Sequence, residues 1–427
     1  MTALRTVELR YGDTSRNVAI PESNFCEELR MREVTPASDP LATIEAALQN
    51  PIGSLPLERL ARGAKRVMIL IDDLTRPTPT HLLLPGILNR LHEAGVQKAE
   101  ITIMVATGTH RSMTPEEMAR KVGAEIFSSY NCVNHKYAED ELADLGETEG
   151  GVPITINRKV VDSDFVIAVG NIVPHRYCGW AGGAKMVQPG VSGEATTAGT
   201  HLMITKVPGA RLGVVENQVR HEIEAVAERA GLRFIVNTVL DRIGEIVDVV
   251  AGDFRRAFRQ GVKLASKIYS APFTSIAEVV LASAYPSDIN LWQAGKAFYS
   301  ADLVVNDGGI IILASPCYEG VGEHGQFGKL LQYDYETIEG MLARGEIEDR
   351  IGAAAALAVA LVRARADIYI VTNNISEKQA AQMDITRFTD IQKALDAALV
   401  VQGKNALVTV LHEATELLPL HGDQLDA

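Results

Sequence analysis

Cationic and imidazole side chains follow three short apolar runs of this sequence. Residues 67–72 (VMILID) precede DLTRPTPTH, residues 101–106 (ITIMVA) precede TGTHR, and residues 164–170 (DFVIAVG) precede a long Gly-rich segment. Near-continuous Val/Ile runs are typical of parallel strands buried on both faces. Ligands bind beyond the carboxyl ends of such strands. If the three strands are neighbours, the residues expected together at one rim of the sheet are Arg76, His110, His175 and Lys185.

These residue types suit acid/base chemistry on a carboxylate. The planar guanidinium of Arg76 can hold a carboxylate in a bidentate pair, although an arginine that bridges loop and sheet is the alternative. Imidazole titrates near neutral pH, so His110 and His175 can act as general bases. A single histidine is more often structural, but two at strand ends make a catalytic reading as reasonable as the structural one.

The segment GWAGGAK (residues 179–185) resembles a phosphate loop only superficially. It lacks the GxxxxGK[ST] spacing, and no GxGxxG occurs in the chain, so neither a nucleoside triphosphate nor a Rossmann-bound NAD is indicated. The glycines allow backbone amides to approach an anion, with Lys185 projecting from the same loop. That lysine is a phosphate ligand, a Schiff-base former, a covalent tether or a solvated surface residue. His201 is a candidate metal ligand that spacing alone does not support.

The chain should fold as two α/β domains with mainly parallel sheets and an active-site cleft between them. A small β-hairpin is expected at residues 4–21, around a GDTS turn. A second set of strands is expected at residues 278–284, 302–307, 309–315 and 367–372. The break between the sets falls near residues 266–278, which gives domains at residues 1–268 and 276–405.

Two helices can be placed from local signals. TPEE (Thr114 to Glu117) has the form of a capping box with proline at the first helical position. A second helix should span about residues 81–95 and end at Gly95, although Pro85 disfavours its first turns.

Composition excludes several classes of protein. The 427 residues are 47% hydrophobic and carry a formal net charge of −13, which fits a globular chain and not a nucleic-acid binder. The longest apolar stretch, residues 351–362, is shorter than the roughly 20 residues that span a bilayer, so we expect a buried helix. The first residues lack the apolar core of a secretory signal, which predicts a cytoplasmic protein. The four cysteines show no CxxC spacing, and neither a disulfide framework nor a zinc site is expected.

Five motifs occur in order and together resemble the nickel-pincer lactate racemase family. They are DLTRPTP (residues 73–79), ATGTHR (106–111), PHRYCGWAGGAK (174–185), PGVSG (189–193) and GTH (199–201). The similarity continues into the second domain, through WQAGKAF (residues 292–298). The family's cofactor is a nickel-bearing pyridinium mononucleotide with a thioamide and a thiocarboxylate.

The resemblance implies a role for each matching residue. Lys185 would be tethered to the cofactor through the thioamide, and His201 would complete the coordination of nickel. The cofactor would also contact Asp73 and the loop glycines Gly182 and Gly183. His110 and His175 would be the acid/base pair. The substrate would be bound by Arg76, Gln293 and Lys296. Arg176 and Tyr177 directly follow His175 and depart from the lactate enzyme, and they are added to the expected substrate site for that reason. Residues 1–268 would then be the cofactor-binding domain, and residues 406–427 would form a tail that returns to it.

The implied reaction is racemisation or epimerisation of a 2-hydroxy acid by hydride transfer, through a planar 2-keto acid. Removing a proton from C2 instead would build a carbanion next to a carboxylate, which hydride removal avoids. The chain departs from the lactate enzyme, which has a tryptophan near the position of residues 351–362, since its only tryptophans are Trp180 and Trp292. Arg176 could therefore accept a second anionic or hydroxylated group, as in malate or a sugar acid, or it could make an interface salt bridge.

Two other functions compete with this one. An NAD-dependent hydroxy-acid dehydrogenase would also use an arginine to bind the carboxylate and a histidine as acid/base. It needs a dinucleotide-binding fingerprint, which this chain lacks. A carboxylate-binding protein without racemase activity would be expected to have lost Lys185 or His201, and both are present. The expected partners are a small 2-hydroxy acid and the proteins that build the cofactor, with neither nucleic acid nor membrane, and the chain would be a monomer or homodimer.

Overall fold

The computed structural model describes residues 3–203, 206–207, 211–322 and 324–422, and it divides the chain into two compact units. The first unit is made of residues 1–32 and 269–427, and the second of residues 33–268. Both units are mixed α/β, as the sequence predicts.

The second unit is built on a six-stranded sheet with the order β13-β12-β9-β4-β5-β6. Its strands are parallel except for β13, which is antiparallel to β12. The principal strands are β4 (Val67–Ile71), β5 (Ile101–Val105), β6 (Asn131–Asn134), β9 (Phe165–Asn171), β12 (Leu232–Leu240) and β13 (Ile246–Gly252). Short strands form two antiparallel pairs, β7 (Leu142–Glu147) with β8 (Pro153–Asn157), and β10 (Pro174–His175) with β11 (Gly179–Trp180).

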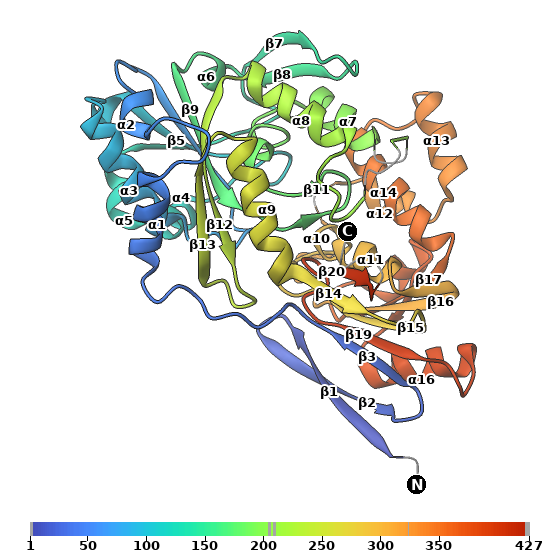
Figure 1. Ribbon diagram of the computed structural model, residues 1–427. Helices are drawn as coiled ribbons and strands as arrows, with labels where there is room; N and C mark the ends of the chain where they lie inside the picture. The colour runs from blue at the N-terminus through green and yellow to red at the C-terminus, as the bar shows by residue number, and fades with distance from the viewer. Residues whose placement is uncertain (1–2, 204–205, 208–210, 323, 423–427) are drawn as a thin grey trace. The chain divides into compact units, whose positions relative to one another are not determined.

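Helices cover both faces of this sheet, as Figure 1 shows for α1 and α3 on one face and α8 and α9 on the other. The core on the first face packs apolar residues of α1, α3 and α4 onto β4, β5 and β9. The helices are α1 (Pro40–Gln49), α2 (Leu57–Leu60), α3 (Thr80–Glu93), α4 (Pro115–Val122), α5 (Ala124–Ser129), α6 (Arg158–Val161), α7 (Glu194–Leu202), α8 (Gln218–Arg229) and α9 (Arg256–Tyr269), with 3-10 turns η1 (Lys98–Glu100) and η2 (Gly183–Met186).

The two helices placed from local signals are present. Helix α4 begins after Thr114, whose side chain accepts from the backbone of Glu117 while Glu117 accepts from the backbone of Thr114. Helix α3 includes Pro85 and ends just before Gly95, which has a φ of +87°. Left-handed φ is the conformation that favours glycine after a helix, so the predicted end of the helix is confirmed.

The first unit is built on a six-stranded parallel sheet with the order β18-β17-β16-β15-β19-β3. These strands are β3 (Phe25–Leu29), β15 (Ala277–Ser283), β16 (Val305–Ala314), β17 (Ala366–Val371), β18 (Thr386–Phe388) and β19 (Val408–Leu411). Two more strands pair in parallel, β14 (Ser270–Phe273) and β20 (Leu418–His421), and the predicted hairpin is β1 (Leu4–Tyr11) with β2 (Thr14–Pro21). The helices are α10 (Leu291–Ala294), α11 (Lys296–Asp302), α12 (Phe327–Leu330), α13 (Tyr335–Ala343), α14 (Arg350–Arg363), α15 (Glu377–Gln382) and α16 (Ile391–Gln402).

Two sequence predictions need correction in this unit. Residues 302–307 and 309–315 were expected as two strands, but they contribute to the single strand β16, whose register against β15 shifts at its start. Asp302 closes helix α11 instead. Gly308, at a φ of +78°, lets the chain bulge within β16 and does not make a turn between strands. The buried helix predicted at residues 351–362 is confirmed as α14.

The two ends of the chain also divide differently from the prediction. Residues 1–32 were assigned to the N-terminal domain, yet they belong to the same unit as residues 269–427. Strand β19 lies between β15 and β3, and β20 pairs with β14. The described part of the tail therefore completes the sheets of this unit, because the wholly buried β19 can satisfy its backbone only between two strands. No helix in the described ranges combines the length and apolarity needed to cross a membrane.

Candidate functional site

The three loops expected to meet do follow adjacent strands. In the sheet order, β9 and β5 lie on either side of β4. Because all three run parallel, their carboxyl ends share one edge of the sheet. This edge carries Asp73 and Arg76 after β4, His110 after β5, and the Gly-rich segment that contains His175 and Lys185 after β9.

His110 is held from behind by a carboxylate. Its Nδ1 lies 2.7 Å from Oδ2 of Asp73, and both side chains are at least partly buried. Burial by itself would raise the pKa of Asp73, but the charge and hydrogen bond of His110, with the charge of Arg76, hold that pKa well below its usual range. Asp73 is therefore ionised at neutral pH and accepts the Nδ1 proton. The imidazole presents Nε2, which is the geometry of a positioned base.

His175 and Lys185 are in direct contact. Nζ of Lys185 lies 2.7 Å from Nε2 of His175. Burial is the largest influence on the amine and, with the nearby charges of Arg76 and Arg220, lowers its pKa to about 8. About a tenth of the amines are then neutral at pH 7, and the neutral form is the nucleophile. A lysine in this state fits the role of a covalent tether better than that of a solvated surface residue.

The glycines of this loop serve its folding. Gly182 has a φ of +98°, and a Cβ built there would lie 2.7 Å from the backbone oxygen of Asn171. At Gly183 the corresponding space is filled by Phe258, 3.1 Å away, while the Gly183 amide donates to Oδ1 of Asn237 over 2.8 Å. The contact of these two glycines with a cofactor stays a prediction.

His201 has the arrangement of a metal-binding histidine. Nδ1 lies 2.8 Å from the carbonyl oxygen of Thr197, one turn earlier in helix α7, so this nitrogen carries the proton and donates it. Metal-bound histidines commonly donate their second ring N–H to a carbonyl in this way. Nε2 then has a lone pair, and the hydroxyl of Tyr177 contacts it. Among the described residues, no three His, Cys, Asp or Glu side chains cluster as a metal site, but the predicted set requires only this one histidine.

The remaining predicted residues have fewer contacts that bear on their predicted roles. Arg76 donates to the backbone oxygen of Thr75 over 3.0 Å and is partly exposed, so its guanidinium remains at the rim of the sheet. Arg176 is also partly exposed. In the other unit, Nζ of Lys296 donates to Oε1 of the buried Gln293, so these two predicted residues do lie together.

Several buried polar residues around the site were missed at the level of sequence. The nearest to a detectable signal is Lys121, which shares the buried face of helix α4 with Met118 and Val122. A lysine in an apolar stripe requires a partner, and here it has Asp72 at 2.7 Å. Cys178, Asn237 and Arg220, the last fully buried in helix α8, gave no such signal.

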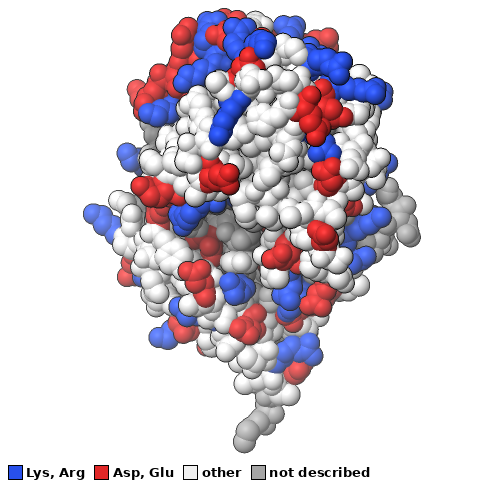
Figure 2. Space-filling model, turned by 90° about the vertical axis from the view of Figure 1, so that its left-hand side faces the viewer, with Lys and Arg blue, Asp and Glu red and all other residues white. Residues whose placement is uncertain are grey.

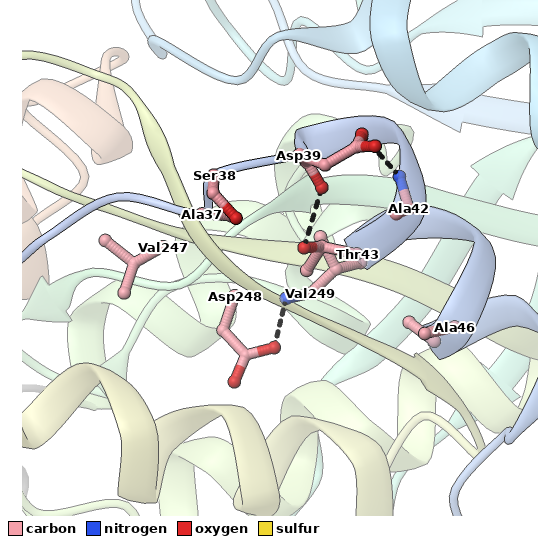
Figure 3. A pocket seen from close by; sticks show the side chains of 10 residues that line it. Ala37, Ser38, Asp39, Ala42, Thr43, Ala46, Val247, Asp248 and Val249 are labelled. Atoms are coloured by element: carbon pink, nitrogen blue, oxygen red, sulfur yellow. Dashed lines mark hydrogen bonds between the residues drawn. The ribbon is translucent and has the colours of Figure 1, made fainter.

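A hollow of about 530 Å³ lies elsewhere in the second unit, between the start of α1 and the edge strand β13 (Figure 3). Its charged residues are two carboxylates. Asp39 accepts from the backbone of Ala42, and Asp248 accepts from the backbone of Val249, as the dashed lines in Figure 3 show. An acidic lining opposes an anionic substrate, so this hollow is a poor match for the predicted chemistry.

The face of the molecule shown in Figure 2 is mixed in charge. On the face shown in Figure 2, Lys and Arg side chains are interspersed with Asp and Glu. The rim of the second unit's sheet differs in composition. The loops after its adjacent strands carry Arg76, Lys185 and two histidines. A local group of cations is what an acidic protein needs to bind a small carboxylate.

Comparison with known proteins gives consistent results for both halves of the chain. A model of the lactate racemase N-terminal domain matches residues 11–213, and a model of the lactate racemase C-terminal domain matches residues 274–418. A lactate racemase from Thermoanaerobacterium thermosaccharolyticum is 28% identical over 97% of this chain and 99% of its own. A lactate racemase from Lactiplantibacillus plantarum is 29% identical over 95% of this chain and 97% of its own.

Solved structures agree with the fold. The lactate racemase apoprotein from T. thermosaccharolyticum superimposes with a TM-score of 0.88 at 27% identity, over 97% of this chain and all of that one. A protein from Thermotoga maritima superimposes with a TM-score of 0.71 at 22% identity, over 91% of this chain and all of that one, and shows the fold alone.

Proposed function

Because the chain belongs to the lactate racemase family, we propose that it is a racemase or epimerase of a small 2-hydroxy acid. The proposal includes a nickel-pincer nucleotide cofactor, bound covalently through Lys185. One observation carries it: two positioned imidazoles and a lysine of lowered pKa occupy the same edge of one sheet. The substrate is lactate-like or malate-like.

The residues fit this cofactor in two respects. Lys185 offers a buried amine whose neutral form is populated near pH 7, which forming an amide-type bond to the cofactor requires. His201 offers Nε2 with its lone pair, since Nδ1 donates to the carbonyl of Thr197. When bound, the cofactor supplies the hydride acceptor for C2 of the substrate.

The side chains of this chain would then manage the carboxylate and the hydroxyl proton. Arg76 binds the carboxylate and holds it while the planar keto acid reorients. His110 takes or returns the hydroxyl proton at Nε2, because its Nδ1 proton is held by Asp73. His175 does the same for the other enantiomer, whose hydroxyl lies differently against a fixed carboxylate.

Four further residues are assigned to the substrate. The proposal assigns Lys296 and Gln293 to substrate binding, and their mutual hydrogen bond keeps the lysine's ammonium oriented. Tyr177, which contacts His201, and Arg176 are assigned to the substrate pocket as well. The proposal includes the proteins that build the cofactor as partners. It takes the chain to be a monomer or a homodimer.

The first test is intact mass together with nickel content, on protein co-expressed with the cofactor biosynthesis enzymes. We expect a mass increase with bound nickel in the wild type and in Lys136→Ala, which changes a surface lysine paired with Glu139. We expect neither in Lys185→Ala.

If the wild type gains neither mass nor nickel while a known racemase prepared in parallel does, the cofactor proposal is wrong. The chain would then be a carboxylate-binding protein of the same fold. If the adduct forms, lactate and malate are the first substrates to assay.

A further inference from the structure

Cys178 has no role in the function proposed above, yet it lies against one of the two histidines. It connects β10 to β11, and its side chain is completely buried. Its Sγ lies 3.3 Å from Nδ1 of His175 and 3.3 Å from the carbonyl oxygen of Trp180. It also lies 3.9 Å from a guanidinium nitrogen of Arg220. The thiol thus contacts Nδ1 of the imidazole, whereas Lys185 contacts Nε2.

The direction of each hydrogen bond follows from what its partners can do. A carbonyl oxygen can only accept, so the S–H of Cys178 donates to Trp180. A guanidinium can only donate, so Arg220 donates to the sulfur. Because the only S–H proton is already donated, the sulfur can only accept a hydrogen bond from His175. Nδ1 of His175 is therefore the protonated nitrogen.

The other side of the ring leads to the same tautomer independently. The pKa of Lys185 is lowered to about 8, so its amine is still mainly an ammonium at pH 7. An ammonium has three donors and no acceptor, so it must donate to Nε2 of His175 over the observed 2.7 Å. Nε2 carries a lone pair, and the ring proton is on Nδ1, which faces Cys178.

We propose that Cys178 is a positioning residue that holds His175 in the Nδ1–H tautomer and so makes Nε2 its proton-accepting atom. The structural part of this proposal stands by itself, and its catalytic consequence rests on the proposed function. Asp73 has the matching position behind His110, 2.7 Å from Nδ1. The two bases thus share one tautomer but are held by different groups, a carboxylate and a thiol.

The use of a thiol here has a chemical reason. A carboxylate behind His175 would add a negative charge near Lys185 and favour the ammonium form of that lysine. The tether, however, forms only from the neutral amine. Cys178 itself raises the pKa of Lys185, but burial and the charges of Arg76 and Arg220 outweigh it and leave that pKa at about 8. Behind His110 the orienting group is the carboxylate of Asp73.

The test reads the tautomer directly, in the full-length apoprotein. Long-range proton–nitrogen NMR of histidine labelled with nitrogen-15 distinguishes Nδ1–H from Nε2–H, and His175→Gln identifies the signal. We expect the Nδ1–H form in the wild type and in Cys178→Ser, which keeps an acceptor. Because the ammonium of Lys185 fixes the same tautomer from Nε2, the thiol is removed in a Lys185→Met background. We expect the Nδ1–H form in Lys185→Met and a raised Nε2–H share in Lys185→Met/Cys178→Ala. The signal of His110 should be the same in every variant and reports that the fold is intact.

An Nε2–H signal for His175 in the wild type would overturn the proposal without any variant. An unchanged Nδ1–H signal in a folded Lys185→Met/Cys178→Ala protein would overturn it too. In the loaded holoenzyme we expect Cys178→Ala to lower kcat about 10–100-fold with Cys178→Ser close to the wild type, as for other groups that orient a functional histidine. Cofactor loading is read separately by mass, so failure of the proposed function would leave the NMR result interpretable.

Discussion

Lys121 is a buried cation beneath the loop that carries two of the proposed site residues. Its Nζ lies 2.7 Å from Oδ1 of Asp72, and it donates to the backbone oxygens of Asp73 over 3.1 Å and of Arg76 over 2.9 Å. Lys121 and Asp72 are each only 6% exposed, so neither charge is solvated by water. The pair should therefore behave as a buried ion pair and not as one of the weak pairs of the surface.

Replacing Lys121 by methionine keeps most of the side chain's volume and removes only the ammonium. Asp72 is then left buried without its counter-ion, which costs about 3–5 kcal/mol when one partner of such a pair is lost. The two loop carbonyls also lose a donor, at roughly 1 kcal/mol each. We expect the free energy of unfolding at pH 7 to fall by about 5–7 kcal/mol, the sum of these two losses.

The loss should also depend on pH in a definite direction. Burial raises the pKa of Asp72, and the charge and hydrogen bond of Lys121 oppose that rise. Without Lys121 the pKa of Asp72 rises further, so the folded state binds a proton more tightly than the unfolded state does. A group of this kind supports stability at low pH and loses that contribution as the pH rises through its folded pKa. The deficit of Lys121→Met should therefore be larger at pH 7 than at pH 5.

Urea unfolding followed by circular dichroism measures both effects. The matched control is Arg120→Met, an exposed position on the same helix, which should change stability by no more than about 0.5 kcal/mol. The double variant Asp72→Asn/Lys121→Met removes both charges and should be more stable than Lys121→Met by at least about 1 kcal/mol. The reasoning is refuted if Lys121→Met loses less than about 1 kcal/mol, or if the double variant recovers nothing.

Three further outcomes are expected. Asp73→Asn should lower kcat about 10²–10⁴-fold by releasing the tautomer of His110. Because the pKa of Asp73 is depressed in the folded state, the stability lost in this variant should shrink as the pH falls below about 4, and equal losses at pH 3 and 7 would contradict this. Gly182→Ala should lower stability by about 1–3 kcal/mol in thermal unfolding, since its Cβ meets backbone, and more than Gly231→Ala, where φ is +83° and the space is open. Arg176→Ala should lower kcat/KM for malate more than for lactate. Equal losses for the two substrates would contradict a role of Arg176 in specificity.

The alternation of residue types along the chain was enough to predict most of the local structure. The capping box at Thr114 and the turn at Gly95 involve neighbours a few residues apart, so their chemistry is contained in a short segment. The apolar runs at β4, β5 and β9 predicted buried parallel strands, because such strands contact helices on both faces. A shared edge for His110, His175 and Lys185 was predicted only on the condition that the three strands are neighbours, which the sheet order shows.

The limits of the sequence appear where distant segments meet. Strand β3 pairs with β19, nearly the whole chain apart, and the hairpin β1–β2 contributes Val7, Leu9 and Val18 to the core of the first unit. No local pattern distinguishes these partners from others of equal apolarity. Their choice depends on which arrangement buries every strand and satisfies its backbone at once.

The same division holds within the site. Residue types and order indicated which side chains could do the chemistry. Only the folded chain decided what stands behind each of them: Asp73 behind His110, Cys178 behind His175, and Lys121 beneath Arg76. Hydrogen bonds of about 3 Å are formed or lost by shifts smaller than a side chain. Such contacts are therefore fixed by the packing of whole elements, which a one-dimensional pattern does not contain.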